Sequence, residues 1–307
     1  MDWNQLRVFA TVAEVGSFTG AGKVLNLSQS AVSRQIGTLE GSLGVMLFRR
    51  HASGIMLTEP GIELQAAVQD MSSRLALAMG RINEYREQPE GPLRITSSVA
   101  FGSGWLSARM NHFLEQYPDI SVSLLLVDNL ELDLSQGQAD VAIRFERPTQ
   151  PNLVQRKLMT IHYHVFASTA YLEENGVPKT AADLDQHRLI VYGDDVQAPV
   201  QNINWLLKEG RPEDDPREPA LRVNSVYGIY RAVQSGLGIA ALPYYLSEEA
   251  PNLIEILPEA TGPSIDAFFV YPEELRHSKR IDVLRDFLLD EVKAYKSKMK
   301  TRGAASC

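Results

Sequence analysis

Cysteine is almost absent from this chain. The only one among its 307 residues is Cys307, at the end of the sequence. A disulfide within one chain is therefore excluded, and so is a redox sensor that pairs two cysteines of one subunit. Chains without disulfides are typical of reducing compartments, so we expect this protein to act in the cytoplasm.

Long hydrophobic runs are also missing. No stretch of about 18 apolar residues occurs, so the sequence offers no candidate for a transmembrane helix. Asp2 stands near the start, and no basic leader precedes an apolar core, which argues against a secretory signal. Hydrophobic residues make up 44% of the chain, which is enough to build the cores of two or three globular units.

The patterns that would indicate an enzyme are lacking as well. The G-x-S-x-G turn of hydrolases does not occur. His162 and His164 face one side of an expected strand, but no clustered third metal ligand accompanies them. The glycine pattern at Gly236 and Gly238 follows a helix and precedes a strand, the reverse of a dinucleotide-binding loop. We therefore expect no catalysis, no metal and no cofactor.

The net charge of −8 is unfavourable for a DNA-binding protein, but it is unevenly distributed. Residues 1–57 hold five basic and three acidic side chains and carry +2, residues 58–88 carry −2, and residues 89–307 carry −8. Only the N-terminal segment is positive, so we expect contacts with nucleic acid there.

Three short helices are predicted in this positive segment. The first shows apolar residues at helical spacing from Trp3 onwards and ends at Gly16. The second covers about 18–26, with Ser17 suited to cap it. The third follows a turn at Ser28, so the segment has the order of a helix-turn-helix.

The third helix has two faces of different chemistry. Val32, Ile36 and Leu39 form one buried stripe. The opposite face suits a DNA major groove, since Gln pairs with adenine, Arg with guanine, and Ser with phosphates or bases. Its members are Gln29, Ser30, Ser33 and Arg34. Taken alone, the same residues also fit an ordinary solvated helix face.

The segment after this helix favours the DNA-binding interpretation. Residues 44–58 fit a two-stranded wing whose turn is Ser53-Gly54 and whose anchors are apolar. Arg49 and Arg50 stand at the base of the wing, where they can reach phosphates. A winged helix-turn-helix is therefore predicted.

These segments resemble the LysR-type transcriptional regulators over roughly 60 residues, almost without gaps. The similarity is carried by Gly16-Ser17-Phe18-Thr19, by 27–36 (LSQSAVSRQI), by Leu43-Gly44 with Leu47-Phe48, and by Leu57-Thr58. The resemblance implies DNA contacts from Ser28, Gln29, Ser30, Ser33 and Arg34 on the helix and from Arg49 and Arg50 at the wing. Gly37 and Ser53 depart from it, because members often carry basic residues there.

A long helix is predicted after Thr58, a plausible N-cap. Its apolar residues are spaced alternately four and three apart, a heptad seam typical of helix pairing. They are Leu64, Val68, Met71, Leu75, Ala78, Ile82 and Tyr85. The helix ends before the Pro89–Pro92 break, so we interpret it as dimerising, although it could instead pack on its own domain. The resemblance implies a dimer or tetramer on an inverted-repeat promoter site.

From Leu93 onwards, strands and helices alternate, which predicts a parallel α/β sheet. One of the predicted helices is short and covers 130–138. The resemblance continues through 137–144 (GQADVAIR) and 236–243 (GLGIAALP), and it implies a two-lobed effector domain like the periplasmic binding proteins. The expected segments are 1–58 for the winged helix-turn-helix, 59–88 for the linker helix, 92–300 for the effector domain and 301–307 for a tail. Lobe I would combine 92–162 with 268–300, and lobe II would span 163–267, with crossing strands near 163–166 and 265–269.

Three segments further resemble an alphaproteobacterial subset of the family, the LsrB/VtlR-like regulators. They are 102–106 (GSGWL), 131–140 (ELDLSQGQAD) and 229–240 (IYRAVQSGLGIA).

Effectors are expected where strand ends meet helix N-termini. The matching positions are Ser97, Ser98, Ala100, Phe101, Asn129, Arg144, Phe145, Asn224, Ser225 and Tyr227. Arg144 could clamp a carboxylate, such as that of an amino acid, or could form an internal ion pair. Ser97 and Ser98 could equally be helix caps.

Two functions remain open on this sequence. The first is a ligand-responsive transcription regulator. The second is a solute-binding module whose N-terminal helices serve only assembly.

Overall fold

The computed structural model describes residues 2–51, 54–83, 88–128, 132–146, 152–193, 200–212, 214–248, 250–260 and 262–305, with the backbone alone at 50–51, 54, 73–74, 76–83 and 300–305. The chain forms two compact units, residues 1–79 and 80–307, and each is considered by itself.

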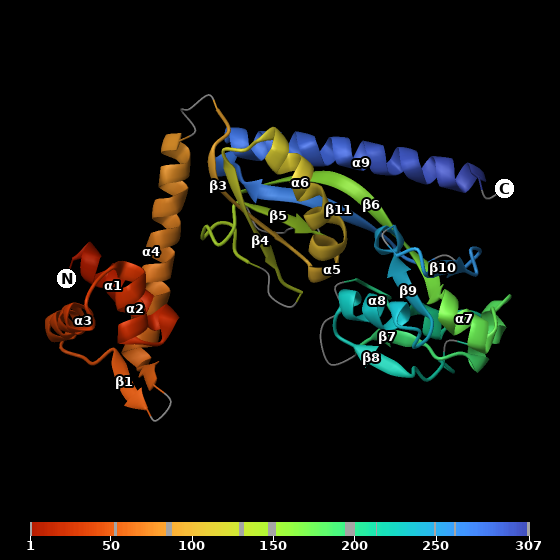
Figure 1. Cartoon of the computed structure of the whole chain (residues 1–307), viewed down its shortest axis with the longest axis horizontal. Helices are drawn as coiled ribbons and strands as arrows, with labels where there is room; N and C mark the ends of the chain where they lie inside the picture. Colours follow the sequence, from red (N-terminus) through yellow and green to blue (C-terminus); the bar gives the residue numbers. More distant parts are fainter. Residues whose placement is uncertain are drawn as a thin grey trace. The chain divides into compact units, whose positions relative to one another are not determined.

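The first unit is a winged helix-turn-helix followed by a long helix (Figure 1). Its elements are α1 (Trp3–Val15), α2 (Phe18–Leu25), α3 (Gln29–Leu43), β1 (Phe48–His51), β2 (Gly54–Leu57) and α4 (Glu59–Asn83). Side-chain oxygens cap the first three helices, from Asp2, Ser17 and Ser28. Gly16 and Gly44 end α1 and α3 in the left-handed conformation, where glycine carries no steric penalty.

One hydrophobic core holds this unit together. Phe9 and Val12 of α1 and Val32 and Leu39 of α3 are fully buried in it. The ring of Phe48 from β1 lies 5.3 Å from that of Phe9, so the wing shares the core of the helices. Burial of this apolar surface fixes which face of α3 remains outside.

A single carboxylate ties the wing to α3. Glu40 Oε1 accepts the backbone N–H groups of Leu47 at 2.7 Å and of Phe48 at 3.2 Å. Leu47 directly precedes β1, and Phe48 is the first residue of β1, where it pairs with Leu57 of β2. The carboxylate of Glu40 therefore satisfies backbone donors, which explains one of the three acids in the positive segment 1–57.

Two residues of the expected dimer seam pack inside their own unit. Val68 is buried in the core of the winged helix-turn-helix, and Leu64 packs against that core. Met71 and Leu75 are 45% and 47% exposed, so the apolar stripe of α4 becomes accessible about two turns after Leu64, where the expected seam begins. The side chains of Ala78 and Ile82, and Tyr85 as a whole, lie outside the described residues.

The second unit contains a mixed sheet with the strand order β10-β6-β11-β5-β3-β4, and β9 also pairs with β6. Its strands are β3 (Gly91–Ser97), β4 (Ile120–Leu126), β5 (Val141–Arg144), β6 (Leu153–Ser168), β9 (Ala240–Pro243), β10 (Leu253–Ile256) and β11 (Ser264–Pro272). A separate pair is formed by β7 (Ile190–Tyr192) and β8 (Leu221–Val223). β3 is parallel to β4 and β5, as the strand-helix alternation predicted. The prediction is wrong for the rest of this sheet, because β11 runs antiparallel to β5 and β6, and β6 runs antiparallel to β9 and β10.

The strand β6 changes partners along its length. Its residues 153–162 pair with β11, whereas 163–168 pair with β9 and β10. The change falls between His162, opposite Ser264, and Tyr163, opposite Pro243. This is where a crossing strand was expected from the resemblance, so β6 is shared by two groups of strands.

Helices cover both strand groups. Residues 99–116 form one helical stretch of α5 (Val99–Phe101), a π-helical turn (Gly102–Leu106) and α6 (Ser107–Gln116). α6 lies beside α9 (Lys279–Ala305), with the rings of Phe113 and Phe287 5.2 Å apart (Figure 1). α7 (Thr169–Asn175) and α8 (Val226–Gln234) accompany the second group, with 3-10 turns at Ala181–Gln186, Trp205–Leu207, Tyr244–Ser247 and Glu273–Leu275.

Two sequence predictions differ from the structure here. The short helix expected over 130–138 is wrong for its described part, which forms turns. Asp133 Oδ1 accepts the N–H and the hydroxyl of Ser135, a local bond that competes with a helix. The strand β10 was not predicted, because its four residues carry only a weak pattern, with Leu253 and Ile256 buried.

We expect Gly61→Ala to destabilise the first unit. A Cβ at Gly61 would lie 2.2 Å from the carbonyl oxygen of Leu47 and 2.9 Å from a methyl group of Leu57. Forcing α4 away from the wing should cost about 1–3 kcal/mol. Gly41→Ala is the matched control, because a Cβ there meets nothing within 4 Å and should gain about 0.5–1 kcal/mol in helix propensity.

Urea unfolding followed by circular dichroism measures both variants. Equal midpoints for the two would contradict the close approach at Gly61.

Candidate functional site

The outer face of α3 presents the polar side chains that the sequence singled out. Gln29, Ser30, Ser33 and Arg34 are all exposed, and Val32 on the opposite face is fully buried. Within the part of the chain that the structure describes, the guanidinium of Arg34 forms no ion pair. Its five N–H donors are therefore available to an external acceptor.

The serines at the start of α3 divide their roles. Ser28 Oγ accepts the N–H of Ala31 at 3.2 Å and thereby caps the helix, and it lies 3.0 Å from Ser30 Oγ. Ser28 thus positions the first turn of α3. Ser33 lies one turn further along α3, on the exposed face, where its hydroxyl can contact a molecule that binds to this face.

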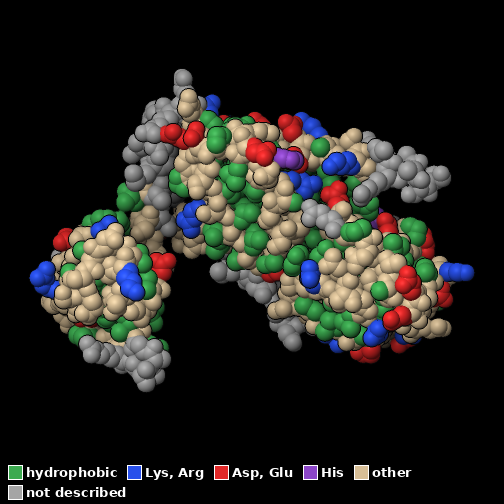
Figure 2. All heavy atoms as spheres, in the orientation of Figure 1, with side chains coloured by type: hydrophobic (Ala, Val, Ile, Leu, Met, Phe, Trp, Pro, Cys, Tyr) green, Lys and Arg blue, Asp and Glu red, His purple; other side chains and the backbone are tan. Residues whose placement is uncertain are grey.

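The wing contributes one described cation. Arg49 is exposed on β1, opposite Met56 of β2. The side chain of Arg50 and all of Ser53 lie outside the described residues. Figure 2 shows separate Lys and Arg side chains on the visible face of this unit, with acidic ones nearby, rather than one continuous basic patch.

A pocket lies in the second unit, where β6 changes partners. Three of the predicted effector residues line it, Ser98, Ala100 and Phe145. Ser98 also caps the helix that follows, since its Oγ accepts the N–H of Phe101 at 3.3 Å. Ser98 is therefore a helix cap that also lines the pocket, and its contact with an effector stays a prediction.

Six other predicted effector residues do not line the pocket, and Asn129 lies outside the described residues. Phe101 is fully buried behind the wall, with its ring 5.7 Å from Phe145 and 5.4 Å from Tyr245. Ser97 is buried on β3. The remaining four are Arg144, Asn224, Ser225 and Tyr227.

Arg144, which was expected as a carboxylate clamp, does not line this pocket. It is 8% exposed, and its Nη2 donates to the carbonyl oxygen of Leu132 at 3.0 Å. This hydrogen bond is to a neutral backbone carbonyl, and the ion pair with an acid that was the alternative for Arg144 stays a prediction. The N–H groups of a buried guanidinium donate to internal acceptors of this kind, because an unsatisfied buried donor reduces the free energy of unfolding.

Eight lining residues were missed by the sequence analysis. They are Asp128, Ile161, Tyr163, Val200, Val226, Pro243, Tyr245 and Ile265. Asp128 is the last residue of the strand expected over 120–128, one position before the chosen Asn129. Tyr163 and Ile265 fall on the expected crossing strands. The sequence pattern could therefore have identified those three residues as candidates. Val200, Pro243 and Tyr245 line the pocket only because of the tertiary structure.

Asp128 joins two helix starts at the edge of the pocket. Its Oδ1 accepts the N–H of Val99 at 2.9 Å, and its Oδ2 accepts the hydroxyl of Ser225 at 3.3 Å. The oxygen of Ser225 in turn caps α8 by accepting the N–H of Gly228. One carboxylate therefore links the helical stretch after β3 with α8, which belong to the two strand groups.

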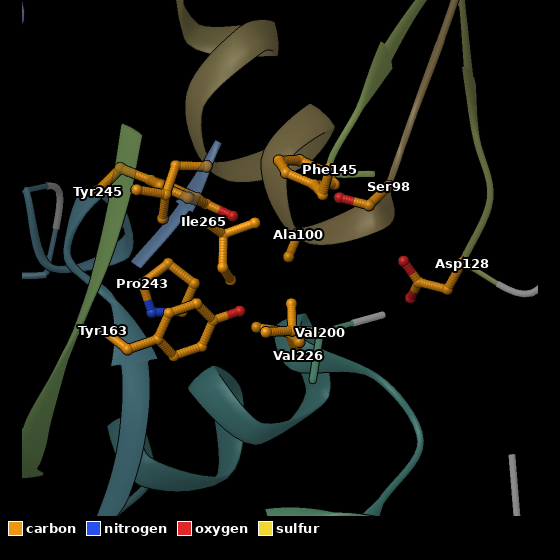
Figure 3. A pocket seen from close by; sticks show the side chains of 11 residues that line it. Ser98, Ala100, Asp128, Phe145, Tyr163, Val200, Val226, Pro243, Tyr245 and Ile265 are labelled. Atoms are coloured by element: carbon orange, nitrogen blue, oxygen red, sulfur yellow. The ribbon is translucent and has the colours of Figure 1, made fainter. Parts of the chain in front are cut away.

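Two buried phenols face the pocket. Figure 3 shows the hydroxyl of Tyr163 directed towards Val200 and Val226, with Asp128 on the far side. Burial raises the pKa of Tyr163 above its usual value, and nearby Tyr192 raises it further. Burial likewise raises the pKa of Tyr245. Both side chains are therefore neutral hydrogen-bond donors at ordinary pH.

The two histidines that could have indicated a metal are engaged elsewhere. His162 Nδ1 lies 2.8 Å from Ser264 Oγ, and His164 Nδ1 lies 2.6 Å from Glu255 Oε1. Among the described residues, no group of three or more His, Cys, Asp or Glu side chains could hold a metal ion. The helices of the same residues include none that is long and apolar enough to cross a membrane.

Comparison with known proteins identifies the family. Residues 3–62 match the family described as "Bacterial regulatory helix-turn-helix protein, lysR family", and residues 86–293 match the "LysR substrate binding domain". The chain therefore belongs to the LysR family of bacterial transcriptional regulators. It is a DNA-binding regulator with an effector-binding domain, and its family consists of regulators rather than enzymes.

Individual relatives agree with this assignment over nearly the whole chain. An HTH-type transcriptional regulator of Xanthomonas campestris is 30% identical over 292 residues, covering 94% of this chain and 85% of its own. The regulator CrgA of Neisseria meningitidis is 29% identical over 292 residues, covering 94% and 96%. The solved structure of CrgA has a TM-score of 0.58 at 27% identity and covers 95% and 99%.

A further structure supports the fold alone. Full-length CbnR, solved with its target DNA, has a TM-score of 0.66 at 21% identity and covers 96% of this chain and 99% of its own. The expected architecture, a winged helix-turn-helix, a long helix and a two-lobed α/β domain, is thereby confirmed.

We expect Asp128→Ala to destabilise the second unit by about 1–3 kcal/mol, because the N–H of Val99 and the hydroxyl of Ser225 lose their acceptor. Asp128→Asn retains one acceptor oxygen in a side chain of the same shape. It should therefore reduce the free energy of unfolding by less than half as much as Asp128→Ala does. Unfolding in urea measures the difference. If both variants unfold at the wild-type midpoint, Asp128 does not link the two helix starts.

Proposed function

We propose that the chain regulates transcription as one subunit of a homodimer. Each subunit places α3 in the major groove of promoter DNA, and each responds to a small molecule in the pocket of its second unit. The observation that carries the proposal is the exposed polar face of α3, with Arg34 free of ion pairs among the described residues. Arg in a major groove pairs with guanine through two hydrogen bonds.

The contacts divide by chemistry. Gln29, Ser33 and Arg34 are suited to base edges, while Ser28 and Ser30 are suited to backbone phosphates near the helix start. Arg49 and Arg50 at the wing add phosphate contacts. Because the winged segment carries only +2, a single unit offers few of these contacts, and pairing two units doubles them.

The dimer is proposed to form through α4. Met71 and Leu75 are exposed apolar residues on one stripe of this helix, and the heptad spacing continues to Ala78, Ile82 and Tyr85. Two such units would read the two halves of an inverted repeat. Further assembly into a tetramer, action in the cytoplasm and the alphaproteobacterial LsrB/VtlR-like placement remain predictions from the resemblance.

We expect the double change Ser33→Ala and Arg34→Ala to abolish specific binding to promoter DNA, because it removes the base-pairing groups from α3. Electrophoretic mobility shift with DNA from the gene's own locus measures this. Thr38→Ala, on the same helix with its hydroxyl bonded to the carbonyl oxygen of Arg34, is a control that should bind normally.

The salt dependence gives a second readout of the same proposal. With about four to eight phosphates contacted per dimer, the slope of log affinity against log salt should be roughly −4 to −7. A flat dependence, or a change of oligomer size instead of DNA binding in the double variant, would support the alternative in which the N-terminal helices serve only assembly.

We expect Leu75→Glu to shift the protein towards monomer, because it places a charge on the apolar stripe of α4. Ser72→Glu adds the same charge at an exposed position of the same helix outside the stripe and should leave the assembly intact. Sedimentation velocity distinguishes the two. A Leu75→Glu protein that sediments like wild type would rule out this part of α4 as the seam.

A further inference from the structure

The polar groups of the pocket in the second unit indicate which ligand charge it accepts. Asp128 is the one ionisable acid among the described lining residues, and no Lys, Arg or His is among them. Its carboxylate already accepts hydrogen bonds from Val99 and Ser225. The described part of the lining therefore offers no cationic side chain to hold an anionic ligand.

The helix starts beside Asp128 nearly cancel its charge. The N-terminus of a helix is equivalent to about half a positive elementary charge. Two helical segments have their N-termini beside Asp128. The stretch from Val99 to Gln116 begins at the N–H of Val99, and the helix α8 begins after Ser225, and both of these groups donate to Asp128. The sum of these charges is close to zero, so neither a free cation nor a free anion gains a strong partner there.

The remaining lining is apolar apart from hydroxyl groups. Seven of the lining residues are apolar, and Tyr163 and Tyr245 are 6% and 4% exposed. Among the described residues, neither phenol hydroxyl has a hydrogen-bond partner. Neither hydroxyl is among the buried side-chain atoms that lack a partner, so both oxygens are accessible from the pocket, where each can donate to a ligand that supplies an acceptor oxygen.

We propose that this pocket takes a neutral, largely apolar small molecule with an oxygen acceptor, and that the hydroxyl of Tyr163 donates to that oxygen. The inference rests on the proposed function, in which this pocket is the effector site, and it replaces the carboxylate or amino-acid effector expected from Arg144. The apolar walls hold the body of the molecule, and the phenol selects its polar group.

The environment of the phenols supports the exclusion of anions. The burial that raises the pKa of Tyr163 and Tyr245 acts against negative charge on any group in the same place. A carboxylate would be desolvated there without a cationic partner. A free ammonium would have to compete with Val99 and Ser225 for Asp128, whose charge the helix starts already balance.

Three probes of similar size test the charge selection. Benzyl alcohol is neutral, benzoate is an anion and benzylamine is a cation at pH 7. The dissociation constant of each for the full chain follows from the rise of the melting temperature with probe concentration. We expect benzyl alcohol to bind at least about tenfold more tightly than either ion. Stronger binding of benzoate or benzylamine, or no stabilisation by benzyl alcohol, overturns the proposal.

A pair of tyrosine variants locates the binding. Tyr163→Phe should raise the dissociation constant of benzyl alcohol roughly three- to tenfold, because one hydrogen bond to the ligand is lost. Tyr271→Phe removes a phenol oxygen from a residue that is 3% exposed on β11 and does not line the pocket, so it should bind benzyl alcohol like wild type. Equal affinities for the two variants would overturn the role of Tyr163.

Mobility shift with promoter DNA, run on the same wild-type preparation, separates the two proposals. Normal DNA binding together with a preference for an ion overturns only the ligand class. Loss of specific DNA binding by the wild-type protein itself contradicts the proposed function.

Discussion

The hydrogen bonding of β6 is the constraint on which the second unit depends. Its residues 153–162 pair with β11, and 163–168 pair with β9 and β10, so one strand is built into two groups of strands. Each of these pairings fixes the register of its own part of β6, and Val165 and Phe166 pair on both sides, with β9 and β10. The pocket forms where the partners change, because Ile161 and Tyr163 on either side of that point both line it. Its position therefore follows from the crossing itself.

Asp128 gives this pocket a charge pattern opposite to the one expected. A sheet edge with helix N-termini is ordinarily a place for an anionic ligand. Here the chain supplies its own anion, which accepts from Val99 and Ser225, while Arg144 turns to the carbonyl oxygen of Leu132. Two neutral phenols and apolar side chains complete the site. The resulting pocket resembles a small apolar cavity with a few hydrogen-bond donors more than a carboxylate clamp.

The apolar residues of α4 follow one heptad pattern, but packing in the first unit gives them two different roles. The heptad spacing of α4 runs without a break from Leu64 to Leu75, yet Leu64 and Val68 pack on the core that contains Phe9 and Leu39. Only Met71 and Leu75 are exposed among the described side chains of the seam. The first part of α4 therefore stabilises the unit that reads DNA, and the later part remains for a partner.

The sequence by itself determined the family, the order of the elements and the outer face of α3. Those features depend on local spacing, caps and turns, such as Ser17, Ser28 and Gly16, which act within a few residues. Only the tertiary structure decided the lining of the pocket. Tyr163, Pro243 and Tyr245 are brought to Ser98 and Asp128 by long-range strand pairing and burial, and the hydrogen bonds of Arg144 depend on which carbonyl oxygen lies within reach. Those contacts join residues far apart in the chain, so no local pattern encodes them.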